Sequence, residues 1–205
     1  QGQDLLDLLE HHIAQPGVMR PYTKAEVTGW GNYFRSAEQV KFALFERYGW
    51  LAAAGDRHLA EFVPGFLVDE ETIYRYGFSR TPIAYRYNRW KELSSVAERT
   101  ISGELPYTVK HSNEEAVEQM RALVGLGDMF TNVNMENAGQ ITNLPLGAVV
   151  ETNARFSEDS VRPVVAGPLS DGVLNLTLPH VHNQEMIIEA ALYRDKDLAF
   201  QAVFS

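Results

Sequence analysis

Apolar residues recur at helical spacing through the first half of the chain. Between residues 5 and 13, four leucines and an isoleucine form one apolar face, which Pro16-Gly17 ends. We expect longer helices from about Ser36 to Gly55 and from Pro82 to about Gly103, because a proline is tolerated where a helix begins. Residues 21–33 lack this spacing and are expected to form a loop.

Shorter segments are predicted from local signals. Asp69-Glu70-Glu71 starts either a helix or a loop, and residues 74–78 alternate tyrosine, tyrosine and phenylalanine at period two, as in an extended segment. Ser112-Asn113-Glu114-Glu115 is a capping signal for a further helix, which should end at Gly125 or Gly127.

The second half changes to strand character. Valine and phenylalanine favour strands in three segments: 129–135, 148–152 and 161–165. A polar connector, Asn137 to Pro145, lies between the first two, and helical patterns return from Pro179 to Leu192 and from Leu198 to Val203. Without a repeat or a low-complexity linker, the sequence predicts one helix-rich α+β domain over 1–205, with a small, mainly antiparallel sheet.

Composition narrows the classes of partner. The net charge is −9, and lysines and arginines are scattered, which argues against a nucleic acid or an anionic membrane as partner. The chain has no cysteine, which excludes a thiolate metal site and fits a reducing compartment, so we expect a cytoplasmic protein. No apolar run approaches the roughly 20 residues that span a bilayer.

A crowded polar turn, Gly55 to Phe66, lies between two apolar helical runs. Within six residues it places an acid, a base, an imidazole and a second acid: Asp56, Arg57, His58 and Glu61. These side chains cannot all be core residues, so the turn lies at a surface, in a cleft or at a site. A simpler interpretation is a helix that Asp56 caps, with a solvated first turn.

Other candidate sites have simple structural explanations. His180 and His182 would share one face of an extended segment, yet they lie at a predicted helix start, where capping or packing explains them as well. His11 and His12 are neighbours on a helix and point about 100° apart, a poor geometry for metal ligation. Residues 85–90, rich in tyrosine and arginine, suit either surface packing or a sugar-binding edge. We predict no metal site within this chain.

Three stretches, in the same order, resemble the C-terminal half of glycoside hydrolase family 4, most closely its α-galacturonidase and α-galactosidase members. They are Gly55 to Phe62, Asn132 to Val150 with its N-x-G-x-I-x-N-L-P core, and Asn183 to Ala202. The resemblance implies a C-terminal domain like that of lactate and malate dehydrogenases. It also implies an upstream Rossmann domain that binds NAD, with Mn²⁺ held mainly by residues before Gln1, and a homodimer or homotetramer.

The resemblance further implies an unusual hydrolysis of an α-galacturonide or α-galactoside. Hydride leaves sugar carbon C3 for NAD, the metal polarises the resulting ketone, a base removes the C2 proton, and the C1 substituent is eliminated. Matching the motifs makes Asp56 the first candidate for the base, with His58 second or orienting it. Arg86 and Asn88 match an R-x-N pattern that contacts the substrate, and Arg57 should point away or pair with Glu61.

Two other functions stay open. A 2-hydroxy-acid dehydrogenase of the same fold would need arginine and histidine at spacings that this sequence lacks. A non-catalytic carbohydrate-binding or oligomerisation module is compatible with the acidic, helix-rich composition. The connector Asn137 to Pro145 either approaches the sugar or joins two strands structurally, and Gly139 and Pro145 favour the structural role.

Overall fold

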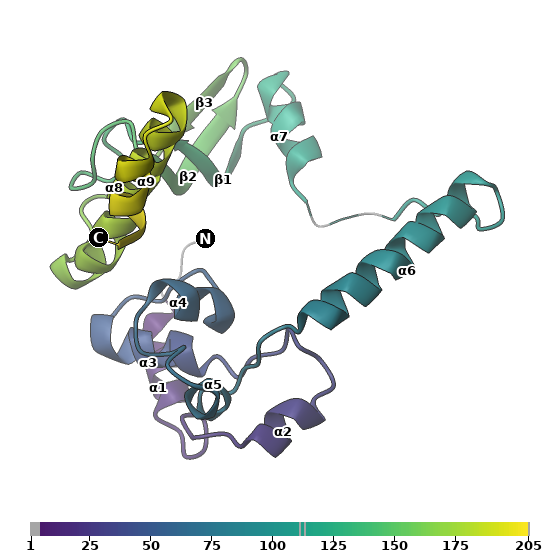
Figure 1. Cartoon of the computed structure of the whole chain (residues 1–205). Helices are drawn as coiled ribbons and strands as arrows, with labels where there is room; N and C mark the ends of the chain where they lie inside the picture. The colour runs from purple at the N-terminus through teal and green to yellow at the C-terminus, as the bar shows by residue number, and fades with distance from the viewer. Residues whose placement is uncertain (1–4, 111, 113, 205) are drawn as a thin grey trace. The chain divides into compact units, whose positions relative to one another are not determined.

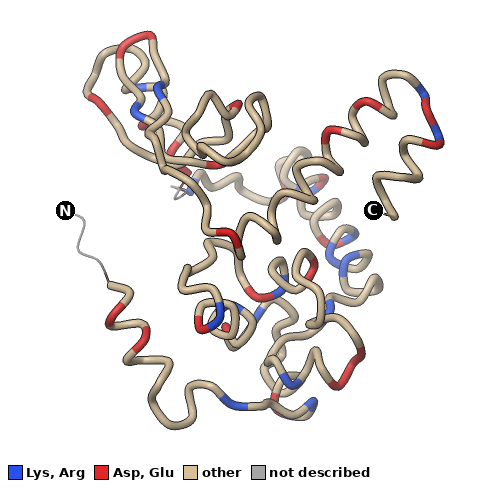
Figure 2. The backbone as a smooth tube through the Cα atoms, turned by 90° about the vertical axis from the view of Figure 1, so that its left-hand side faces the viewer, with Lys and Arg blue, Asp and Glu red and all other residues tan. Residues whose placement is uncertain are grey.

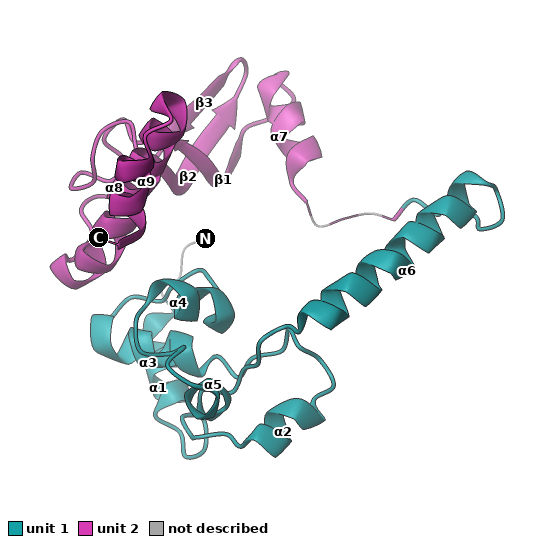
Figure 3. Ribbon diagram, viewed as in Figure 1, with its two compact units in different colours: residues 1–109 teal, residues 110–205 magenta. Residues whose placement is uncertain are grey.

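The computed structural model describes residues 5–110, 112 and 114–204, which form nine helices and a three-stranded sheet (Figure 1). They divide into two compact units, Gln1–Val109 and Lys110–Ser205 (Figure 3). The predicted α+β class with a small antiparallel sheet is confirmed. The assignment of residues 1–205 to one domain stays a prediction.

The first unit is helical. Its helices are α1 (Leu6–Ile13), α2 (Lys24–Gly29), α3 (Gln39–Tyr48), α4 (Asp56–Phe62), α5 (Glu70–Arg75) and α6 (Ile83–Ile101). Its core draws on α3, α4, α5 and the segments around them: Val40, Leu44, Ala60, Phe66, Ile73 and Phe78. Phe78 is only 2% exposed, so the segment that leads into α6 is fixed at its start.

Three secondary-structure predictions in this unit were wrong, and the first two concern the segments around α2 and α3. The expected loop over 21–33 contains α2, whose capping box was overlooked: Glu26 N donates to Thr23 Oγ1 at 3.3 Å, and Thr23 N donates to Glu26 Oε2 at 2.8 Å. The helix expected to run to Gly55 ends at Tyr48, because Gly49 takes a left-handed conformation (φ 71°) and donates to the carbonyl of Phe45.

The extended segment expected over residues 74–78 was also wrong. Asp69 caps a helix instead, since its Oδ1 accepts a hydrogen bond from Thr72 N at 2.7 Å, and α5 runs through Tyr74. Gly77, at φ 69°, then turns the chain, and its carbonyl accepts from Ala37 N at 2.9 Å. The turn delivers Phe78 to the core.

Replacing Gly77 by Ala should destabilise the protein by about 2–3 kcal/mol, combining a left-handed conformation with overpacking. An added Cβ would lie 2.5 Å from Ala37 Cβ and 3.1 Å from Tyr22 Cδ2. Gly17→Ala is the matched control, because Gly17 also has a positive φ (86°) but has nothing within 4 Å of an added Cβ. Urea unfolding should give the larger loss for Gly77→Ala; equal losses would contradict the steric argument.

The second unit carries the sheet. Its elements are α7 (Ala116–Leu123), β1 (Met129–Glu136), β2 (Val149–Ser157), β3 (Ser160–Pro163), α8 (Asp171–Tyr193) and α9 (Lys196–Phe204). The sheet order is β1-β2-β3, with both pairs antiparallel and Val133 opposite Thr152. Strand β2 alternates between exposed and buried residues, and α7 packs Ala122 against Ala154 and Phe156. The three predicted strands are confirmed, with small differences in their bounds.

Helix α8 begins at Asp171, eight residues before the predicted start at Pro179. Proline lacks the N–H of an internal helical residue and usually breaks a helix. Here Leu174 and Leu178 pack with Val181 in a cluster beneath β2, so tertiary contacts favour helix on both sides of the proline. The capping signal at residues 112–115 gives no side-chain cap from Glu115, the N-cap of α7, and Asn113 lies outside the described residues.

Acidic and basic residues are interspersed along the described chain (Figure 2). Within those residues, no helix has both the length and the apolar character needed to cross a membrane.

Candidate functional site

Helix α4 carries the motif that the sequence singled out, and it buries the first acid. Gly55 is the N-cap, and Asp56 is the first helical residue, with 0% of its surface exposed. Its Oδ1 accepts a hydrogen bond from the backbone N of Lys41 at 2.8 Å. Lys41 lies in the first turn of α3, where N–H groups have no partner within the helix, and the N-cap Glu38 makes no side-chain cap. Asp56 therefore caps α3 across the fold instead of capping its own helix.

The second oxygen of Asp56 is also buried, and no described residue hydrogen-bonds to it. Burial raises the pKa of Asp56 to about 6, and the hydrogen bond from Lys41 N only partly opposes that rise. The carboxyl is thus poised to titrate near neutral pH, in a position closed to solvent.

This shift predicts a pH dependence of stability. The native pKa of Asp56 lies above its ordinary value of 3.8. The contribution of this carboxyl to the free energy of unfolding is therefore most favourable below about pH 4 and is lost as pH rises through 6. A shift of this size corresponds to about 3 kcal/mol in the free energy of unfolding. Urea titrations at a series of pH values from 4 to 7.5 should show that the free energy of unfolding of Asp56→Asn increases relative to that of the wild type as the pH rises. Parallel stability curves for the two proteins would contradict the buried-acid assignment.

The next residues of α4 are accessible and differ in their contacts. The His58 side chain is 74% exposed, and its Nδ1 lies 3.5 Å from Glu61 Oε2. Arg57 Nη2 donates to Thr81 Oγ1 at 2.6 Å, and its guanidinium lies over the ring of Phe34. Of the two expectations for Arg57, pairing with Glu61 was wrong, because Glu61 lies beside His58 and Arg57 contacts Thr81 and Phe34 instead.

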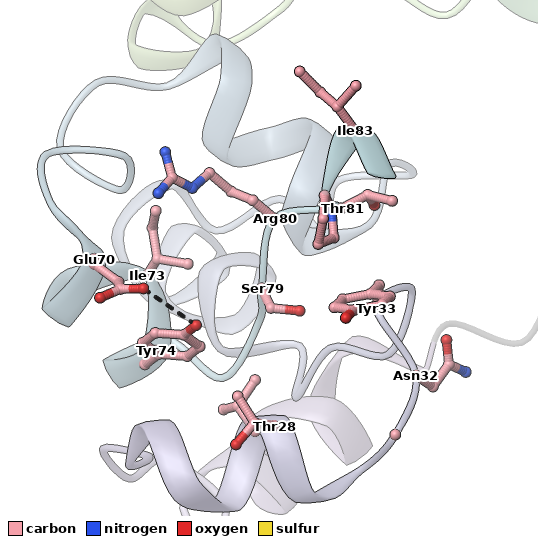
Figure 4. A pocket seen from close by; sticks show the side chains of 13 residues that line it. Thr28, Asn32, Tyr33, Glu70, Ile73, Tyr74, Ser79, Arg80, Thr81 and Ile83 are labelled. Atoms are coloured by element: carbon pink, nitrogen blue, oxygen red, sulfur yellow. Dashed lines mark hydrogen bonds between the residues drawn. The ribbon is translucent and has the colours of Figure 1, made fainter. Parts of the chain in front are cut away.

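Thr81 joins α4 to a cavity of about 640 Å³ in the first unit (Figure 4). Helices α2 and α5, the loop after α2 and the segment before α6 supply its polar wall: Thr28, Tyr33, Glu70, Tyr74, Ser79 and Arg80. Figure 4 shows Arg80 and Glu70 on one side and Tyr33 on the other. Sequence reasoning missed this cavity, although a polar run directly before the helix-starting Pro82 is a usual place for functional side chains.

Helix α6 borders the same region through Tyr85, whose ring meets those of Tyr33 and Phe34 edge-on at 5.1 and 5.9 Å. Arg86 and Asn88 are exposed on the same helix but do not line the cavity. Residues two apart on a helix point in nearly opposite directions, whereas residues three apart lie on one face. Asn88 therefore shares the face of Tyr85, and Arg86 points elsewhere.

Comparison with known proteins settles the family. The model of the family 4 glycosyl hydrolase C-terminal domain matches residues 1–205. The chain belongs to this family. The resemblance inferred from three motifs is confirmed at that level.

Similar proteins support the same assignment. The chain is 53% identical to an alpha-galacturonidase of Thermoanaerobacterium saccharolyticum, over 83% of the chain and 37% of that protein. It is 48% identical to an alpha-galacturonidase of Thermoanaerobacter italicus, over 83% and 38% respectively. A crystal structure from Bacillus subtilis is 41% identical, with a TM-score of 0.84 over 98% of this chain and 45% of that one. The chain thus spans less than half the length of these relatives.

The connector of this family 4 domain has a structural role. Asn137 Nδ2 donates to three carbonyls, those of Ile141, Leu144 and Pro145, at 2.9–3.1 Å, and its Oδ1 accepts from the N–H groups of Gly139 and Ile141. Asn143 exchanges two further hydrogen bonds with the backbone of Leu169. The Asn137 bonds thus hold the connector between β1 and β2 together, and the Asn143 bonds tie it to the segment before α8, in line with the structural role that Gly139 and Pro145 favoured.

The histidines of the family 4 domain do not assemble a metal site in the described part of the chain. His180 and His182 lie in the middle of α8, not at a helix start, so their Cα–Cβ bonds point in nearly opposite directions. Within residues 5–110, 112 and 114–204, no group of three or more His, Asp or Glu side chains could hold a metal ion. The Mn²⁺ that the resemblance implies therefore does not fit these residues on their own.

Proposed function

We propose that the chain is the C-terminal, substrate-side part of an NAD- and Mn²⁺-dependent α-glycosidase that acts on α-galacturonides or α-galactosides. Its membership of family 4 and its identity to two alpha-galacturonidases support this proposal. A Bacillus subtilis alpha-galactosidase is only 27% identical to the chain, so of the two substrates we propose the galacturonide first.

The observation that carries the catalytic proposal is the exposed imidazole of His58 beside Glu61. Nδ1 lies 3.5 Å from the Glu61 carboxylate, and the exposed Nε2 is accessible to take up a proton, as a general base requires. His58 then removes the proton from sugar carbon C2. Asp56, the other candidate, is buried against Lys41 N, so we assign it to positioning α4 relative to α3.

The two residues of the R-x-N pattern, Arg86 and Asn88, lie on different faces of α6. Asn88 shares the face of α6 that carries Tyr85, whose ring contacts Tyr33 of the cavity wall, so we assign Asn88 a hydrogen bond to a sugar hydroxyl. Arg86 is the second candidate and would meet a substrate group from the other face of the helix.

The remaining parts belong to the longer protein. We assign NAD to an upstream Rossmann domain and Mn²⁺ mainly to residues before Gln1, as the family 4 membership of the chain suggests. A cytoplasmic homodimer or homotetramer, without a nucleic-acid or membrane partner, completes the proposal.

The test is an assay of the full-length protein on aryl α-galacturonide and aryl α-galactoside with NAD, Mn²⁺ and a reductant. We expect release of the aryl group, and in deuterated water we expect deuterium at C2 of the sugar. A protein that oxidises 2-hydroxy acids instead would be a dehydrogenase of the same fold. Sugar binding without turnover or C2 exchange would indicate a non-catalytic module.

A further inference from the structure

The cavity of the first unit contains an arginine whose charge is not neutralised. Glu70 and Arg80 are the charged side chains that line it. Lys24 Nζ lies 3.1 Å from both carboxylate oxygens of Glu70, and Tyr74 Oη donates to the same carboxylate at 3.4 Å. Among the described residues, Arg80 forms no ion pair. The cavity therefore presents a net positive group, in a chain whose net charge is −9.

The backbone that carries Arg80 is held at both ends. On one side, Ser79 is buried and Phe78 lies in the core. On the other, Thr81 accepts the hydrogen bond from Arg57 at 2.6 Å, directly before α6 begins. The Arg80 side chain itself is exposed, so the fixed backbone sets where the side chain starts at the cavity wall and leaves its guanidinium accessible to a ligand.

The rest of the wall suits a sugar. The hydroxyl groups of Tyr33 and Ser79 line the cavity and can donate or accept a hydrogen bond. Two threonine hydroxyls also line it: that of Thr28 donates to backbone carbonyls of α2 and can still accept, and that of Thr81 accepts from Arg57 and can still donate. A planar guanidinium matches the two oxygens of a carboxylate in a bidentate arrangement. One arginine among several hydroxyls thus fits a ligand with many hydroxyls and a single carboxylate.

We infer that this cavity binds a hexuronide and that Arg80 holds its C6 carboxylate. The inference rests on the proposed function and deepens it, because it names the residue that distinguishes a galacturonide from a galactoside. The two sugars differ at C6, which is a carboxylate carbon in a galacturonide and a hydroxymethyl carbon in a galactoside.

The test compares Arg80→Gln with the wild type in the full-length enzyme. The KM for aryl α-galacturonide should rise about 10- to 100-fold, as expected for a lost charge-assisted hydrogen bond, while the KM for aryl α-galactoside stays unchanged. The KM of Arg80→Lys for aryl α-galacturonide should lie between those of the wild type and Arg80→Gln, because an ammonium keeps the charge but not the bidentate geometry. Arg75→Gln is the matched control: Arg75 is exposed in the same unit and does not line this cavity.

Direct binding separates the failure of this inference from the failure of the proposed function. Titration of the full-length protein with galacturonate and with galactose should show a preference for galacturonate that Arg80→Gln removes, with an unchanged melting temperature. That result supports the inference even if no glycoside is turned over. If the variant keeps the wild-type preference, or if the wild type has none, Arg80 does not hold the carboxylate.

Discussion

Replacing His58 by Gln should lower kcat for aryl α-galacturonide about 10²- to 10⁴-fold, the range that a positioned general base contributes. Glutamine has a similar size and can hydrogen-bond, but it cannot accept a proton at neutral pH. The loss should appear in kcat and kcat/KM alike with KM nearly constant, because proton transfer occurs only in the transition state. Deuterium incorporation at C2 should fall by the same factor. Folding should be unaffected, since the His58 side chain is 74% exposed.

His11→Gln is the matched control for this variant. His11 is also an exposed histidine on a helix of the first unit, in the last turn of α1, and it has no role in the proposal. It should retain wild-type kinetics. If His58→Gln keeps its C2 exchange while Asp56→Asn loses it with NAD binding intact, the base is Asp56, and α4 must open to expose it.

The elements that the sequence predicted well are those with a strong local signal. Helix α6 follows Pro82 as expected, and the strands follow their valines and phenylalanines. The short helix α2 also had a local signal, the pair Thr23 and Glu26, and could have been found. The helix across Pro179 could not, because its stability comes from packing against β2 in a cluster that includes Val150.

The candidate site depends on contacts that are distant in sequence. Asp56 has the sequence context of a solvated helix cap, but it is buried because the unpaired N–H of Lys41, fifteen residues earlier, lies beside it. The cavity joins side chains as far apart in sequence as Thr28 and Arg80. Motif matching located α4 and α6 because each motif is local, whereas burial and cavity shape emerge only when helices pack.

The connector offers the sharpest test of a residue that family motifs emphasise. Asn137 lies in the N-x-G-x-I-x-N-L-P core and is only 1% exposed. Asn137→Asp should destabilise the second unit by about 4 kcal/mol or more at pH 7, a size typical of a buried, unpaired charge. The new carboxylate oxygen would face the three carbonyls that Nδ2 now contacts, and it has no hydrogen to donate to them. Amide hydrogen exchange across β1 and β2 should report the loss directly.

The pH dependence of Asn137→Asp distinguishes this mechanism from a general disturbance of the turn. Repulsion by the carbonyls and burial raise the pKa of an acid at this position above its unfolded value. Its deficit is therefore smallest in acid and grows as pH rises through the native pKa. Asn132→Asp is the control, because Asn132 is an exposed residue of β1 opposite the neutral Asn153 and gains the same charge in water. A similar, pH-independent loss in both variants would mean that the amide of Asn137 is not what holds the connector, and a sugar-facing role would then explain the motif better.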